Sequence, residues 1–426
     1  MQLYKTPLRK AVEEYLEYDF SRLHMPGHKG VAPSAIDLGA MYDITEFEGS
    51  DSLYAPTGCI LELEKRFSEL YCTETSLLSA GGSTLCIQAM LALVAKPDCT
   101  LIAGRNIHIS AVNAMALLGI NPYWVYPEKC DNDPLIGRIS PAAIQAALEK
   151  NPDAVGVYIT SPDYFGVISD IKAISLICER YSVPLLVDNA HGAHLAFLKP
   201  RLHPIRLGAS MCCDSLHKTL PVLTGGALLH ILDKRFAGDA KRCMSIFGST
   251  SPSYLIMLSA DNCMGLLEQD LPLLLELTVA RVQALQQTAL NKGFVLPQGV
   301  CDPMRLTLCP AASGISGNDF YNHLKRYHIM PEFISDNGCV FLFSPYNDGC
   351  DFDRVNDAIL SAPLSAPAVF SPKEELLIQD AVGRVSAEVK SPCPPGIPLI
   401  MPGEVLTRES TEILLQYGVS SINVIK

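Results

Sequence analysis

Short, wholly apolar runs alternate with amphipathic stretches through the middle of this sequence, from about residue 55 to residue 265. The apolar runs predict buried strands, and the amphipathic stretches between them predict surface helices. Strands are expected at residues 100–103, 123–126, 154–160, 185–188, 209–213 and 227–231, and helices at 84–95, 110–118, 141–149 and 171–181. This order predicts an α/β fold in which helices cover both faces of a mostly parallel sheet.

The segments on either side of this region have patterns of their own. Residues 6–20 have helical spacing, with one apolar side formed by Leu8, Val12, Leu16 and Phe20. A long helical stretch spans residues 254–292, and Pro272 inside it predicts a kink or a break. Later strands are expected at 305–309 and 340–344, and later helices at 317–327 and 352–360. We therefore expect an N-terminal segment (1–54), a large domain (55–265) and a smaller C-terminal α+β domain (266–426).

The composition narrows the class of protein without identifying its function. The chain has 426 residues, of which 48% are hydrophobic and 18% charged, and this length predicts two or three domains. Its net charge of -12 argues against a nucleic-acid-binding protein, which normally carries a basic face. No apolar run reaches the roughly 18 residues of a membrane span, and no signal peptide is recognisable at the start. The 15 cysteines form no C-x-x-C pair, which indicates reduced thiols in a cytoplasmic protein.

Two ionisable residues lie close to the ends of successive apolar runs. Asp188 ends the run that begins at Val183, and Lys218 follows the run from 207 to 213. In parallel sheets, ligands bind at the carboxyl ends of the strands. An acid at one strand end and a lysine at the next indicate a pyridoxal-phosphate (PLP) site. The lysine would hold the aldehyde as a Schiff base, and the acid would bind the ring nitrogen. Either residue alone is also typical of an ordinary surface or loop position.

A glycine-containing turn at residues 80–84 precedes an expected helix. Glycines let the backbone approach a phosphate, and a helix N-terminus offers free N–H groups and a favourable dipole. Ser83 and Thr84 would add hydroxyl groups, although the same residues are typical of a plain N-cap. Ser215 and His217, beside the lysine, are further candidates for binding the phosphate.

Histidines follow two of the expected strands. His108 can stack its flat imidazole on the cofactor ring, or it can simply begin a helix. His191 and His194 form an H-x-x-H pattern that, with Asp188, also fits a metal site. We expect no metal, because the sequence has no H-E-x-x-H motif and a metal site would leave Lys218 unexplained.

A series of short motifs extends over most of the chain. In sequence order they are His24-Met25-Pro26-Gly27-His28-Lys29, Asp43-Ile44-Thr45-Glu46 with Asp51, Pro56-Thr57-Gly58, Gly82-Ser83-Thr84, Arg105-Asn106-x-His108, Asp188-x-Ala190-His191-Gly192-Ala193-His194, Ser215-x-His217-Lys218-Thr219-Leu220-Pro221, Pro394-Pro395-Gly396-Ile397-Pro398 and Pro402-Gly403-Glu404. Together they resemble the ornithine/lysine/arginine decarboxylase family of the aspartate-aminotransferase fold (fold type I). The resemblance implies PLP as cofactor, a mostly parallel sheet of the seven-stranded type, and a compact form without the N-terminal wing domain.

The resemblance also implies roles for individual residues. Lys218 would carry the cofactor, Asp188 would bind the pyridine nitrogen, His108 would stack on the ring and His191 would sit near it. The residues implied to hold the phosphate are Ser83, Thr84, Ser215 and His217, and Glu404 resembles a rim residue near the substrate. The family usually forms homodimers with shared active sites, so the acidic N-terminal loop can reach across. Two features depart from the family pattern, namely Leu-Cys-Ile at residues 85–87 and an aspartate at 163.

These features predict a decarboxylase that acts on arginine, lysine or ornithine and forms CO2 and a polyamine precursor. The distal cation of such a substrate would be met by an acid, and the candidates are Glu46, Asp51, Asp163 and Glu404. An aminotransferase or lyase of the same fold is an alternative, with Arg305 or Arg384 as the clamp for the α-carboxylate. A catalytically inactive family member is a further alternative, against which the intact Asp188, His191 and Lys218 argue.

Overall fold

The computed structural model describes residues 6–17, 39–47, 49–128, 137–364, 373–388, 390, 400 and 404–425. Its central sheet has the strand order β1-β7-β6-β5-β4-β2-β3. The strands are β1 (Thr75–Ser79), β2 (Thr100–Gly104), β3 (Asn121–Val125), β4 (Val157–Thr160), β5 (Leu185–Asp188), β6 (Met211–Asp214) and β7 (Ala227–Ile231). Only β7 in this sheet runs antiparallel to its two neighbours, so the predicted mostly parallel sheet is confirmed.

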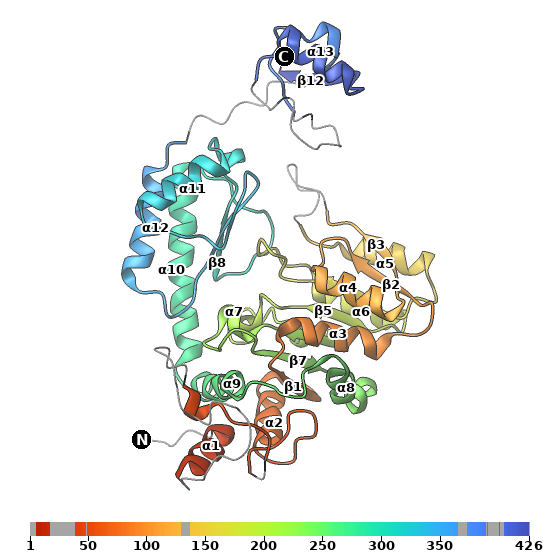
Figure 1. Cartoon of the computed structure of the whole chain (residues 1–426), viewed down its shortest axis with the longest axis vertical. Helices are drawn as coiled ribbons and strands as arrows, with labels where there is room; N and C mark the ends of the chain where they lie inside the picture. Colours follow the sequence, from red (N-terminus) through yellow and green to blue (C-terminus); the bar gives the residue numbers. More distant parts are fainter. Residues whose placement is uncertain are drawn as a thin grey trace.

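Helices cover both faces of this sheet because its strands are apolar on both sides. On β4, Tyr158 packs with one helical layer, whereas Val157 and Ile159 pack with the other. The first layer contains α3 (Gly82–Val94), α4 (Ile109–Leu118) and α8 (Lys234–Phe247), and the second contains α5 (Pro141–Lys150) and α6 (Ile171–Arg180). This alternation is the period of two that a strand imposes on its side chains. Figure 1 shows α3, α4 and α8 along the large domain.

Within the central sheet, the edge strand β1 is the strand that the hydrophobic pattern did not predict; β9 (Phe333–Ile334), β11 (Lys373–Leu377) and β12 (Ser421–Ile425), outside this sheet, were not predicted either. It is only five residues long and contains two serines and a threonine. Its outward N–H groups are satisfied by side chains of α2 (Cys59–Tyr71): Ser76 N–H donates to Ser68 Oγ at 2.8 Å and Leu78 N–H to Glu64 Oε1 at 2.8 Å. The helix therefore covers an edge that would otherwise be open to pairing with another strand.

Helices α1 (Pro7–Glu17) and α9 (Tyr254–Leu267) lie at the lower end of the large domain, and α10 (Leu271–Lys292) runs from there into the C-terminal part (Figure 1). In α1, Leu8 and Val12 are fully buried as predicted, and Phe20 lies outside the described residues. The break predicted at Pro272 is confirmed, because the proline lies in the first turn of α10 just after α9 ends. A proline is tolerated there because the first N–H groups of a helix have no intrahelical partner.

The C-terminal part of the chain contains two separate hydrophobic clusters. One joins α10 to β8 (Arg305–Leu308), β10 (Cys339–Leu342), α11 (Gly317–Arg326) and α12 (Gly349–Ser361), with the short strand β9 (Phe333–Ile334) at the edge. The other is formed by β11 (Lys373–Leu377), β12 (Ser421–Ile425) and α13 (Arg408–Gln416). The remaining short helices are η1 (Ala40–Tyr42), η2 (Ala193–Ala196), η3 (Pro204–Leu207), α7 (Leu216–Thr219), η4 (Ala311–Ser313) and η5 (Ile378–Asp380).

Two predictions from composition can be compared with this structure. The described cysteines are all free thiols, and most of them are buried. Among the described residues, no helix is both long and apolar enough to cross a membrane.

Candidate active site

Lys218 lies in α7, directly after β6, at the carboxyl edge of the sheet. Its Nζ atom is 3.0 Å from Nε2 of His191, which lies in the loop after the neighbouring strand β5. Burial lowers the pKa of Lys218, and the charge of Asp188 opposes this shift. The side chain is therefore shifted toward the neutral amine that attachment to an aldehyde requires.

Asp188 is the last residue of β5 and is only 2% exposed. Its Oδ1 accepts a hydrogen bond from the Ala190 N–H at 3.1 Å, and the Cys213 thiol donates to the same oxygen at 3.6 Å. Burial raises the pKa of Asp188, whereas the hydrogen bond from Ala190 and the charges of Lys218 and His108 lower it. A buried carboxylate of this kind is stabilised by an added cation, and the protonated ring nitrogen of PLP is such a cation.

His191 is the direct neighbour of Lys218 and is nearly buried. Burial lowers the pKa of His191 well below its ordinary value, and the positive charges of Arg305 and Lys218 lower it further. The imidazole is therefore neutral and can accept a hydrogen bond from the lysine. Its buried Nδ1 has no hydrogen-bond partner among the described residues, so one polar atom remains available to a ligand.

The four predicted phosphate-binding residues come from the start of α3 and from the segment that contains Lys218. The Ser215 hydroxyl donates to Ser83 Oγ at 2.9 Å, which joins the two segments. No side chain caps the N-terminus of α3, so Ser83 and Thr84 are not acting as an N-cap. His217 Nδ1 lies 3.0 Å from the Gly226 carbonyl oxygen, which makes this nitrogen the donor. The uncapped N–H groups and the paired serines fit a bound phosphate.

His108 begins a helix, which is one of the two roles that the sequence left open, and its stacking on the cofactor ring stays a prediction. It caps α4, because the Ser110 N–H donates to its Nδ1 at 3.2 Å. Its exposed ring is also close enough to Asp188 and His191 to lower the pKa of each. A helix-capping histidine is thus held beside the candidate ring site.

The two histidines of the H-x-x-H pattern have different partners. His191 contacts Lys218, whereas Nε2 of the buried His194 lies 2.7 Å from Oδ1 of Asp302. The pattern therefore does not place both rings around one ion. Among the described residues, the His/Cys/Asp/Glu group that is compact enough for a metal is a different one, His203, Asp214 and His230.

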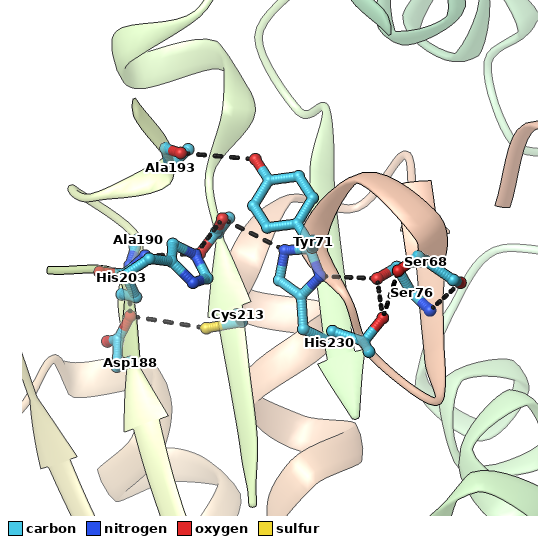
Figure 2. A network of polar contacts seen from close by, with 12 residues as sticks. Ser68, Tyr71, Ser76, Asp188, Ala190, Ala193, His203, Cys213 and His230 are labelled. Carbon is cyan, nitrogen blue, oxygen red and sulfur yellow. Dashed lines mark hydrogen bonds and ion pairs between the residues drawn. The ribbon is translucent and has the colours of Figure 1, made fainter. Parts of the chain in front are cut away.

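This group forms a buried polar network behind the site (Figure 2). Asp214 accepts hydrogen bonds from Asn189 Nδ2 at 2.7 Å, from His203 Nε2 at 2.9 Å and from His230 Nε2 at 3.2 Å. Burial alone would raise the pKa of Asp214, but the two histidines hold it far below its usual range. The Tyr71 ring packs 4.2 Å from that of His230.

The network fixes the spacing of the two strand ends that carry the site. Asn189 directly follows Asp188, and Asp214 directly precedes Ser215. The hydrogen bond between Asn189 and Asp214 therefore holds the candidate ring-nitrogen acid and the candidate phosphate serine in one geometry. The sequence did not reveal this network, because the two histidines that bind Asp214 lie elsewhere in the chain. His203 lies just before η3 and His230 lies in β7.

Asp51, one of the predicted substrate acids, contacts the backbone of its own chain. Its carboxylate accepts hydrogen bonds from the N–H groups of Thr57, Gly58 and Ile60 at 2.8, 2.9 and 3.0 Å. These groups lie at the start of α2, so Asp51 caps that helix. Its predicted role in binding a substrate stays a prediction, and these hydrogen bonds give it a structural role as well.

Asp163, another predicted substrate acid, shapes a loop, and its role toward the substrate stays a prediction. It is 3% exposed and accepts hydrogen bonds from the N–H groups of Gly137, Phe165 and Val167. Its departure from the family pattern therefore reflects the local backbone. The other departure, residues 85–87, is also explained: these side chains are buried in the core under α3.

The stability of the protein should depend on pH through Asp163. Burial raises the pKa of Asp163 to about 6, above the ordinary value of about 3.9 in an unfolded chain. The folded state thus binds this proton more tightly, so the contribution is favourable below about pH 4 and is lost as the pH rises through about 6. Relative to Asp163→Asn, the free energy of unfolding of the wild type should fall by about 2–3 kcal/mol across that window. Urea unfolding at several pH values measures this difference, and a difference that does not change with pH would contradict it.

The remaining predicted substrate acids are not brought to Lys218. Glu46 is exposed in the N-terminal segment, where its charge raises the pKa of Tyr54 and of Tyr254, after the larger effect of burial on each. Glu404 belongs to the part that contains β11 and β12, where its carbonyl oxygen accepts from the Ser386 N–H at 2.8 Å. The motifs at 24–29, 394–398 and 402–403 lie outside the described residues.

One acid near the site was missed by the sequence reasoning. Glu332 precedes β9, and its Oε1 accepts a hydrogen bond from the Tyr164 hydroxyl at 3.3 Å. Its charge raises the pKa of Lys218, against the larger effect of burial. The two residues of the hydrogen bond are 168 positions apart, and no local motif marks Glu332.

Comparisons with known proteins agree with this geometry. The family model of the Orn/Lys/Arg decarboxylase major domain matches residues 6–296, and that of the C-terminal domain matches residues 362–419. The uncharacterized protein YaaO of Bacillus subtilis (strain 168) is 32% identical, over 96% of this chain and 93% of that protein. An arginine decarboxylase of the same organism is 27% identical, over 98% of this chain and 94% of that protein.

A decarboxylase is also found among the solved structures that share this fold. The lysine decarboxylase LdcF of Francisella novicida matches with a TM-score of 0.72 and 16% identity, over 99% of this chain and 81% of that chain. PLP fits the residues present, because a partly desolvated lysine, a buried acid and an uncapped helix N-terminus lie at one sheet edge. The chain therefore belongs to the Orn/Lys/Arg decarboxylase family, a family of PLP-dependent amino-acid decarboxylases.

Proposed function

We propose that this protein decarboxylates a basic amino acid, namely arginine, lysine or ornithine, to CO2 and the corresponding amine. The observation that carries the proposal is the placement of Asp188, His191 and Lys218 beside the joined Ser83 and Ser215. Family relatives named as arginine decarboxylases support a basic substrate.

In this proposal Lys218 would hold the cofactor and Asp188 would bind its ring nitrogen. Bound PLP supplies an electron sink for the pair left when the bond from Cα to the carboxylate breaks. His191 hydrogen-bonds to Lys218 at 3.0 Å and keeps its amine close to the reacting carbon. With its lowered pKa, the Lys218 ammonium would be suited to donate the proton that Cα takes up after CO2 has left.

The aminotransferase alternative depends on Arg305 or Arg384 as the clamp for the α-carboxylate. Arg305 donates from Nη1 to the carbonyl oxygens of Asp163 and Tyr164 at 3.0 and 2.7 Å. Arg384 forms an ion pair with Glu374 at 2.6 Å. Arg384 is thus engaged by its own chain, whereas the buried Nε and Nη2 of Arg305 have no hydrogen-bond partner among the described residues, so Arg305 remains a candidate clamp.

A panel of amino acids tests the proposed reaction. The purified protein with PLP is incubated with arginine, lysine, ornithine and several neutral amino acids, and both CO2 and 2-oxo acids are measured. We expect CO2 and an equal amount of amine from at least one basic amino acid. Formation of a 2-oxo acid without CO2 would instead identify an aminotransferase.

A further inference from the structure

Three aromatic side chains form a cluster beside the candidate cofactor lysine. Tyr164 packs edge-on against the His191 ring at 5.5 Å, and His191 contacts Lys218. Phe333, from β9, packs against Tyr164 at 5.5 Å and against Phe165 at 5.9 Å, again at nearly right angles. The cluster therefore joins the large domain to the C-terminal part of the chain right next to Lys218.

A carboxylate completes this cluster. Glu332 directly precedes Phe333 and accepts the hydrogen bond from the Tyr164 hydroxyl at 3.3 Å. Glu332 is exposed, and the exposed fractions of Tyr164 and Phe333 are 38% and 36%. The acid and two aromatic rings are thus accessible to a ligand. The negative charge of Glu332 also raises the pKa of Tyr164, after the larger effect of burial.

The loop that presents Tyr164 is firmly held. Asp163 accepts the N–H groups that shape it, and Arg305 donates to the carbonyl oxygens at both 163 and 164. The Thr307 hydroxyl donates to the Phe165 carbonyl oxygen at 2.8 Å. Residues from β8 therefore fix the loop in place, so Tyr164 is positioned before any ligand arrives.

A carboxylate beside exposed aromatic faces is the chemistry that recognises an organic cation. The carboxylate forms a charge-assisted hydrogen bond with an N–H group of the cation, and the rings attract the cation through their negative faces. We propose that Glu332, Tyr164 and Phe333 bind the distal ammonium or guanidinium group of the substrate. The inference rests on the proposed function and names the residues that select a basic amino acid.

Amino-acid binding to Glu332→Gln tests this site. Binding is followed by the change in cofactor absorbance on rapid mixing with arginine or lysine, and with citrulline or norleucine as uncharged partners of similar length. The apparent Kd for the basic ligand should rise about 10- to 100-fold, as expected for loss of a charged hydrogen bond. The Kd for the uncharged ligand should stay within about twofold of the wild type. Phe333→Leu should give a smaller and equally selective loss of about two- to fivefold.

Matched controls separate this site from general damage. Asp353→Asn removes the same charge from an exposed position on α12 and should leave all four ligands unaffected. The proposal is overturned if Glu332→Gln weakens charged and uncharged ligands equally, or if it weakens neither. Whether arginine or lysine suffers the larger loss shows which cation the site is built for. Failure of the proposed function gives a different result: the wild type with PLP would then release no CO2 from arginine, lysine or ornithine, whatever the absorbance changes show for Glu332→Gln.

Discussion

Lys218→Ala should abolish the visible absorbance of the bound cofactor and lower CO2 release by more than about a thousandfold. Lys218 is the amine that lies partly buried at the end of β6, in contact with His191 and influenced by the charge of Asp188. Alanine removes both the point of attachment and the proposed proton donor. Absorbance spectra and CO2 release, measured on the same preparation, check both expectations.

Lys172→Ala is a suitable control, because Lys172 is an exposed lysine on α6. It should retain the absorbance and the activity of the wild type. If Lys218→Ala kept both the visible absorbance and the activity, another residue would have to carry the cofactor.

Asp188→Asn should lower CO2 release by about a hundredfold or more while the cofactor remains bound. Asparagine keeps the shape and can still accept a hydrogen bond from the Ala190 N–H, but it cannot form an ion pair with a protonated ring nitrogen. The ring would then be a poorer electron acceptor, although the serines and the lysine that hold it are unchanged. Rates of CO2 release, normalised to bound cofactor, measure this effect.

Asp153→Asn, at an exposed position before β4, provides the matched change of charge. It should behave as the wild type does. Equal rates for Asp188→Asn and the wild type would show that Asp188 does not bind the ring nitrogen.

Local patterns in the sequence were sufficient for most of the sheet and for the position of Asp188 and Lys218. Asp188 ends one buried strand and Lys218 follows the next, and the edge at which parallel strands end is set by the topology itself. The strand β1 was missed because it is short and its polar residues pair with α2 rather than follow an apolar pattern. Its alternation of buried and exposed positions is also absent, since four of its five residues are buried.

The roles of the acids could not be read in the same way. Asp51 and Asp163 look like any acid in a loop, but their oxygens are taken by backbone N–H groups whose positions only the folded chain reveals. Glu332 is the opposite case, because no motif in the sequence made it a candidate. It contacts Tyr164 only when β9 packs beside the large domain. Which acids lie near the site therefore depends on long-range packing, which the sequence does not show. The candidate cofactor residues could be predicted because they lie at the ends of strands.

The attachment point of the cofactor is the measurement that tests this account most directly. The protein with PLP is reduced with borohydride, digested, and mapped by mass spectrometry for a peptide that carries a pyridoxyl group. The pyridoxyl group is expected on Lys218, in the peptide that follows β6. A pyridoxyl group on a different lysine, with Lys218 unmodified, would contradict it.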